Sequence, residues 1–372
     1  MTSVLAMPGA KVQPSRLRFA RMLRGLRQVQ LAEAIDVSAS AVSQFEAGTA
    51  SPDPRTLERI ALTLGCNPDF FARPMARDVG DPFFRSRRAA TKLERDQARA
   101  YALAISEIAT LLEYEVEFPD LVLVPGLARL PESATSEQIE AEAAGLRAAW
   151  GLPGGPIANV VRILESRGAV VVAMGAFEHV DAFSLRADPR PVVVLCSDRG
   201  SAARRRFDAA HELAHLVLHD RPEEANKLQE KQAHNFAAAF LMPTEEVDPW
   251  LPRRGNQLDL LEDGSAVWGV SMQALLYRAK TIGTIGESSY QRTMRRMSAA
   301  GWRTKEPVEI GPPEVPGLLR LAVDALPDAG SSLSQIAAAF GVPSERLKRM
   351  LRLPEEAGGL GQVAYLPRAA TA

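Results

Sequence analysis

The sequence predicts a mainly α-helical protein with an α+β middle domain. Most segments carry apolar residues at helical spacing. Two runs rich in β-branched residues, GAVVVAM at 168–174 and PVVVLCSD at 191–198, predict strands between helices. Helix-capping residues divide the first seventy residues into short helices. We therefore expect a helical head, a connector helix, an α+β middle and a helical tail.

The length of 372 residues suggests two or three domains. Shifts in composition and pattern set the expected boundaries. The expected units are a flexible tail (1–13), a helical head (14–72), a connector helix with a linker (73–135), an α+β domain (136–255), a helical subdomain that completes it (256–305) and a helical C-terminal region (306–372).

Composition restricts the class of protein. Hydrophobic residues make up 46% and charged residues 24%, as in an ordinary globular chain. Two cysteines provide no disulfide framework and fit a reducing compartment. The longest apolar run, 169–177, contains a glycine and is followed by Glu178, so it cannot span a bilayer. The N-terminus lacks the pattern of a signal peptide. We expect a cytoplasmic protein with no membrane partner.

Charge is unevenly distributed along the chain. Residues 1–100 hold 16 Lys and Arg against 10 Asp and Glu, a balance of +6, although the whole chain has a net charge of −1. A basic head on an acidic body indicates a nucleic-acid-facing module at the front.

Two short helices joined by a tight turn at Asp36–Ser38 form the sequence pattern of a helix-turn-helix. Ser38 is placed to cap the second helix, and Gly48 ends it. Six apolar residues would fix the crossing of the two helices: Leu31, Ala32, Ile35, Val37, Val42 and Phe45.

The second helix of this pair would present small and polar side chains to the bases of double-stranded DNA. Gln44 can pair with adenine, whereas serines are less selective. The positions expected to face the bases are Ala39, Ser40, Ser43 and Gln44, and Ser38 directly before them is also expected at the DNA interface. The arginines suited to phosphates are Arg18, Arg21, Arg24 and Arg27.

The string from Gly25 to Gly65 resembles the XRE family of lambda-repressor-like DNA-binding domains. The resemblance covers about 57 residues and implies a five-helix head that binds a DNA operator. It also implies that Gln28 contacts the DNA backbone or an adjacent base. The alternative is a small helical bundle used only for dimerisation. A dimer that contacts two half-sites is expected.

Four of the five histidines lie between positions 211 and 234. His211 and His215 are four residues apart on a predicted helix, so both imidazoles lie on one face and can share a Zn²⁺ ion. Glu212 lies beside them, where its carboxylate can take a proton from water. The alternative is a surface helix with two incidental histidines.

Zinc needs a third protein ligand. His219 lies about 12 Å from His211 along a straight helix, too far to share one ion. On the next helix, Glu230 is near the middle of an apolar stripe, whereas Gln232 points the opposite way. A carboxylate that faces a core is costly unless it is paired or binds metal, so Glu230 is the expected ligand.

His234 lies one helical turn after Glu230, at the edge of the same face. Four roles remain open for it. These roles are the third ligand in place of Glu230, a hydrogen-bond partner of a ligand, a donor to the transition-state oxyanion, and a packing residue.

The strings RRRFDAAHELAHLVLH and EKQAHNFAAAFLMP resemble the ImmA/IrrE family of metallo-endopeptidases. So do the strands DAFSL and PVVVL and the later WGVSMQALLYRA, and the resemblance covers roughly 140–285. It implies a small gluzincin-like peptidase with His211, His215 and Glu230 as zinc ligands and Glu212 as general base. Family members often have Glu-Ala-Asn where this chain has Gln232-Ala233-His234. The PVVVL strand is expected to hold an extended peptide by edge addition.

These resemblances imply a DNA-bound regulator that is also a zinc endopeptidase and cuts a repressor or itself in a stress or mobile-element response. One alternative is a transcription factor whose peptidase-like domain is a ligand sensor or dimerisation scaffold. Another is an antitoxin-like repressor. The tail contains two patterns that read either as further helix-turn-helix units or as helices that pack on the peptidase-like domain.

Overall fold

The computed structural model describes residues 11–75, 83–86, 91–123, 130–131, 133–175, 180–196, 201–219, 226–254 and 257–353. The expected flexible tail therefore falls outside the described residues up to position 10. Gln13 is anchored, because its backbone N–H donates to the carbonyl of Phe71 at 2.7 Å. Within the described residues, no helix has the length and apolar character needed to cross a membrane.

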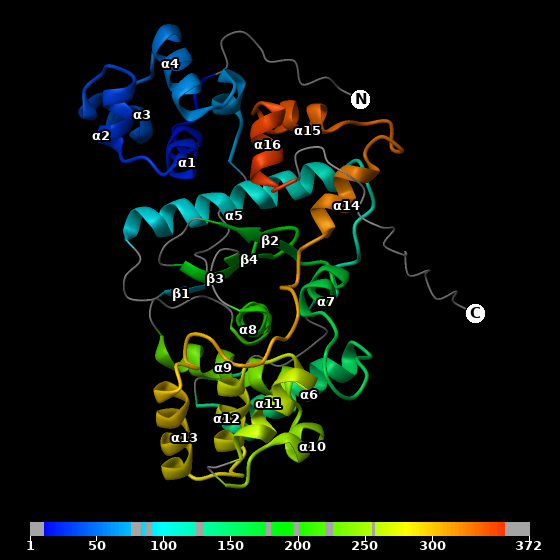
Figure 1. The fold of residues 1–372 in the computed structure, drawn as a ribbon. Helices are drawn as coiled ribbons and strands as arrows, with labels where there is room; N and C mark the ends of the chain where they lie inside the picture. The colour runs from blue at the N-terminus through cyan, green and yellow to red at the C-terminus, as the bar shows by residue number, and fades with distance from the viewer. Residues whose placement is uncertain are drawn as a thin grey trace.

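The head is a compact group of helices at one end of the molecule (Figure 1). Its core contains Leu31, Ile35 and Val42, all fully buried as expected. The fifth element is a short 3-10 helix rather than an α-helix. The elements are α1 (Pro14–Arg24), α2 (Gln28–Ala34), α3 (Ala39–Ala47), α4 (Pro54–Leu64) and η1 (Pro68–Ala72).

A four-stranded sheet lies in the middle of the molecule, with the strand order β1-β3-β4-β2. β2 runs parallel to β4, whereas β3 is antiparallel to both β4 and β1. β1 lies in the unit expected to hold only a connector helix and a linker, and its pairing partner lies about a hundred residues further along the chain. The strands are β1 (Phe83–Ser86), β2 (Val170–Met174), β3 (Val180–Leu185) and β4 (Val192–Cys196).

Helices cover both faces of this sheet. Alternate residues of a strand point to opposite faces. Accordingly, Val192 and Val194 belong to the core shared with α5 (Lys92–Glu113) and the head, whereas Val193 and Leu195 belong to the core of α8 (Ala202–Leu218). Figure 1 shows α5 along one side of the sheet and α8 on the other. The connector helix is therefore a packed layer between the head and the sheet.

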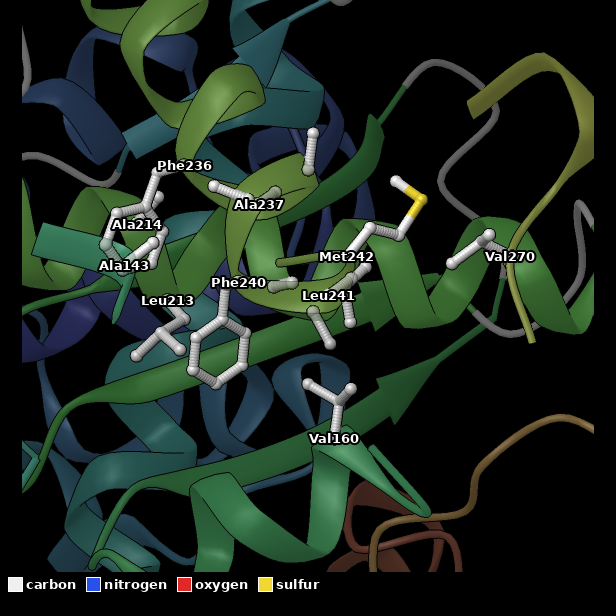
Figure 2. Packing of buried hydrophobic residues seen from close by; sticks show 14 of the residues in the cluster. Ala143, Val160, Leu213, Ala214, Phe236, Ala237, Phe240, Leu241, Met242 and Val270 are labelled. Atoms are coloured by element: carbon white, nitrogen blue, oxygen red, sulfur yellow. The ribbon is translucent and has the colours of Figure 1, made fainter. Parts of the chain in front are cut away.

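The second core is built mainly by α8 and α9 (Lys227–Leu241), with further helices around them (Figure 2). Leu213 of α8 and Phe236 and Phe240 of α9 are fully buried there. The surrounding elements are α6 (Ser136–Ala149), α7 (Val160–Ser166), α10 (Thr244–Val247), η2 (Asp248–Trp250), α11 (Leu258–Trp268), α12 (Met272–Thr281) and α13 (Glu287–Ala299).

The tail folds back to the other end of the molecule (Figure 1). It forms α14 (Leu318–Ala325), α15 (Leu333–Phe340) and α16 (Ser344–Met350). Packing on the α+β domain was expected for the two patterns at 268–283 and 333–351. It is confirmed for the first, because Leu275 and Leu276 of α12 belong to the second core. It is wrong for the second, which forms α15 and α16 and lies on α5 and the head: the rings of Phe340 and Phe70 meet edge-on at 5.7 Å, and Tyr101 donates to the carbonyl of Met350. α14, between the two patterns, contacts β2. Residues 354–372 lie outside the described part.

Candidate metal centre and nucleic-acid interface

α8 carries the His-Glu-x-x-His sequence in its buried second half. The helix begins after Ser201, whose hydroxyl accepts the backbone N–H of Arg204. His211 and His215 are each 1% exposed, and Glu212 is fully buried. The one-turn spacing brings the two Nε2 atoms to 3.1 Å from each other. Both rings therefore direct their Nε2 atoms toward the same position.

Glu230, near the start of α9, completes this cluster. One of its carboxylate oxygens lies 3.4 Å from His211 Nε2 and the other 3.4 Å from His215 Nε2. Among the histidine, cysteine and acidic side chains of the described residues, one group has ligand atoms close enough together to hold a metal ion. This group is His211, His215 and Glu230. The Glu230 side chain is 37% exposed, so solvent reaches the cluster from this side.

The donor set and its spacing fit zinc. Two imidazole nitrogens and a carboxylate are a common catalytic zinc set, with metal–ligand distances of about 2.0–2.2 Å. A tetrahedron with such distances places its ligand atoms about 3.4 Å apart. The distances within the cluster, 3.1 to 3.4 Å, are close to this value. Three protein ligands would leave a fourth position open.

Glu212 is held by the neighbouring strand. The hydroxyl of Ser184 on β3 donates to Glu212 Oε2 at 2.8 Å, and Ser184 is fully buried. The sequence predicted the DAFSL strand but gave Ser184 no role. The signal available in the sequence was a serine beside the apolar residues Ala182, Phe183 and Leu185 of an expected strand.

His219 and Gln232 lie on the other side of His215. His219 Nδ1 is 3.0 Å from His215 Nδ1, and His219 Nε2 is 3.0 Å from Gln232 Oε1. His219 is not part of the metal-ligand cluster. Gln232, expected to point away from the core, is only 4% exposed because His219 and the carbonyl of Pro131 cover its amide.

The same surroundings shift two pKa values. Burial lowers the pKa of His219 to about 4, and the neighbouring His215 acts in the same direction, so His219 is neutral near pH 7. Burial alone would raise the pKa of Glu230, but its interactions with His211 and His215 outweigh burial and hold the pKa well below its usual value. Glu230 is thus a carboxylate, as a metal ligand must be.

His234 lies outside the cluster. Its ring lies between Phe207, at 4.8 Å, and Tyr277, at 4.6 Å, measured between ring centres. It is half-buried. Of the roles left open for His234, this position favours packing beside the centre.

The helix-turn-helix presents a polar surface. Ser38 caps α3, its hydroxyl accepting the N–H of Ala41. The side chains expected to face DNA bases, which are Ala39, Ser40, Ser43 and Gln44, are all exposed, and so are Arg18, Arg24 and Arg27.

Two residues expected at this interface have partners inside the head. Arg21, expected to contact phosphates, is only 8% exposed and pairs with Glu46 through two of its nitrogens, while a third donates to the carbonyl of Leu26. The phosphate role predicted for Arg21 is therefore wrong. The amide of Gln28 also donates to Glu46, at 2.8 Å, so Gln28 lies at the start of α2 with its side chain held.

Two family models match the chain, each over one of these regions. A helix-turn-helix model matches residues 17–71, and a model of the IrrE N-terminal-like domain matches residues 165–280. A search of curated proteins gave no significant match.

The fold and the two matches define a DNA-binding head joined to a peptidase-type domain. More specifically, the chain is a fusion of an XRE-type helix-turn-helix domain and an IrrE/ImmA-like peptidase domain, the architecture of a regulator. Domains of the second type are typically metal-dependent.

Proposed function

We propose that this regulator binds an operator through its head and is an active zinc endopeptidase that cleaves a repressor or itself in a stress or mobile-element response. The observation that carries the proposal is the convergence of His211, His215 and Glu230 at zinc-ligand spacing, next to a buried glutamate. A domain retained only as a scaffold has no need of this arrangement.

The chemistry follows from the side chains around the cluster. Zinc, when bound, would lower the pKa of water and polarise the scissile carbonyl. Glu212 would accept the proton of the attacking water and return it to the leaving amine. Ser184 supports this role because its hydrogen bond fixes the orientation of the Glu212 carboxylate.

The strand order of the sheet contradicts the predicted mode of peptide binding. Edge addition to the PVVVL strand is wrong, because β4 lies between β3 and β2 and its backbone is paired on both sides. β3 carries Ser184 and so lies beside Glu212, and its outer edge is paired with β1. A peptide that adds to β3 would have to replace β1.

This covered edge is the observation that favours the alternative function, a non-catalytic sensor or dimerisation scaffold. In such a protein, the metal centre would stabilise the domain or bind an effector, and β1 would remain in place. The two functions differ in whether peptide bonds are cut while zinc is bound.

DNA contacts and assembly complete the proposal. The exposed surface of α3 supports base contacts by Ser40, Ser43 and Gln44, and the exposed guanidinium groups of Arg18 and Arg27 support phosphate contacts. A homodimer would contact two half-sites. Light scattering of the full chain with and without duplex DNA tests the dimer.

The decisive experiment measures zinc and cleavage on the same samples. The wild-type chain, Glu230→Gln and Glu212→Gln are analysed for zinc content. Each is then incubated alone and with candidate repressors, and the fragments are identified by mass spectrometry. We expect about one zinc per chain in the wild type, less in Glu230→Gln, and full zinc without cleavage in Glu212→Gln.

The outcomes separate the two functions. Fragments that form with the wild type and not with Glu212→Gln support the peptidase. Zinc at full occupancy without any cleavage favours the sensor. A wild type that takes up no zinc when the ion is supplied overturns the proposed metal centre.

A further inference from the structure

A chain of hydrogen bonds leads from His215 to a backbone carbonyl. His215 Nδ1 meets His219 Nδ1 at 3.0 Å, His219 Nε2 meets Gln232 Oε1 at 3.0 Å, and Gln232 Nε2 donates to the carbonyl of Pro131 at 2.8 Å. His215, His219 and Gln232 are each at most 4% exposed. The chain joins the end of α8, the middle of α9 and the segment before α6.

The carbonyl of Pro131 fixes the direction of this chain. A carbonyl only accepts hydrogen bonds, so the amide group of Gln232 faces it and the Gln232 oxygen faces His219. His219 Nε2 must then carry a proton. Because a neutral imidazole has one protonated nitrogen, His219 Nδ1 is an acceptor, and His215 Nδ1 is the donor to it. His215 Nε2 is then unprotonated, and it lies 3.1 Å from His211 Nε2 and 3.4 Å from a Glu230 oxygen, where a bound metal would accept its lone pair.

We propose that His219 and Gln232 are positioning residues that hold His215 in the tautomer required for metal binding, with Nε2 unprotonated and directed at the cluster. The inference rests on the proposed metal centre. A metal-bound histidine is commonly oriented by a hydrogen bond from its other ring nitrogen to a carboxylate, a backbone carbonyl or water. In this chain, a neutral histidine fills that place, and the glutamine behind it sets which of its nitrogens accepts.

This role explains why the chain has a histidine four residues after His215. The spacing continues the helix face of His211 and His215, yet His219 does not reach the cluster. It reaches the far side of the His215 ring instead. A hydrophobic residue at position 219 would leave the buried His215 Nδ1–H without its acceptor. An unsatisfied buried donor destabilises the fold by its desolvation penalty.

The first test reads the tautomers without any metal. The full chain is labelled with ¹⁵N at its five histidines, freed of metal with a chelator, and studied by long-range ¹H–¹⁵N NMR near pH 7. Substitution of each histidine in turn assigns the signals. We expect the Nδ1–H tautomer at His215 and the Nε2–H tautomer at His219. A proton on Nε2 of His215 overturns the inference, whatever the protein does with peptides.

The second test measures zinc affinity by chelator competition. Gln232→Leu removes both the oxygen that accepts from His219 and the amide that donates to Pro131. Asn235→Leu is the matched control, because Asn235 is also buried on α9 and its oxygen accepts from Tyr277, away from His219. Removal of such a partner typically weakens metal binding by about 10- to 100-fold.

We expect that loss in Gln232→Leu and not in Asn235→Leu, although both leucine variants lose stability. Equal zinc affinity in Gln232→Leu and Asn235→Leu overturns the positioning role. Because the NMR test needs neither zinc nor substrate, a failure of the peptidase proposal is distinguishable from a failure of this one.

Discussion

Replacement of Glu46 by alanine is expected to destabilise the DNA-binding head. Glu46 is the counter-charge of Arg21, and the two side chains are 5% and 10% exposed. The substitution would remove both Glu46 acceptors of the buried Arg21 guanidinium and leave its hydrogen bond to the Leu26 carbonyl. Removal of one partner of a buried pair costs about 3–5 kcal/mol, which corresponds to an increase in local opening of roughly 10²- to 4 × 10³-fold.

Hydrogen exchange of amides in α2 and α3, followed by mass spectrometry, measures this opening in the full chain. The controls are Arg18→Ala and Arg27→Ala, whose exposed side chains are expected to change stability by less than about 0.5 kcal/mol. If each of these arginines contacts a phosphate, its removal lowers the salt dependence of DNA binding by about 0.9 in log–log slope. Wild-type exchange rates in Glu46→Ala would refute the role assigned to the Arg21–Glu46 pair.

Three further predictions concern the tail and its contacts. The Phe340 ring is 2% exposed, so Phe340→Ala is expected to lower the free energy of unfolding, measured in urea, by about 3–5 kcal/mol. A loss below about 1 kcal/mol would contradict the packing of α15 on the head. Burial raises the pKa of the Cys66 thiol to about 11, so in a Cys196→Ser background Cys66 is expected to resist thiol reagents at neutral pH until Phe340→Ala loosens the tail. Burial also raises the pKa of Glu165 to about 7, against the opposing hydrogen bonds from Leu318 and Gly317. The resulting stability is present below about pH 4.5 and lost as the pH rises through about 7, so the free energy of unfolding is expected to fall between these values in the wild type and to stay flatter in Glu165→Gln.

Local signals in the sequence were sufficient for the head and for α8. Ser38 caps α3, and Gly48 ends it with a positive φ of 75°. The hydrogen bonds of both caps involve only residues a few positions away in the sequence. His211 and His215 are likewise related by a single helical turn. Glu230 needed one further step, the cost of a carboxylate on an apolar face.

The remaining features depend on contacts between distant segments. Arg21 and Arg18 lie on the same helix and look alike in the sequence. Arg21 is buried because it pairs with Glu46, twenty-five residues further on. β1 is a strand because β3 offers it a backbone edge. Gln232 is buried because of Pro131, a hundred residues earlier. Periodicity within a segment carries no information about such partners.

The layers of the fold place the DNA-binding head and the candidate metal centre in one packed structure. α1 of the head packs on α5, α5 packs on β3 and β4, and β3 packs on α8, the helix that carries His211 and His215. β3 contributes to both cores, since Phe183 belongs to the core of α5 and the adjacent Ala182 to the core of α8. The neighbouring Ser184 holds Glu212. Because packed interiors transmit displacement rather than absorb it, a shift of β3 that follows from a change at its β1 edge would reach the Glu212 carboxylate on one side and α5 beneath the head on the other.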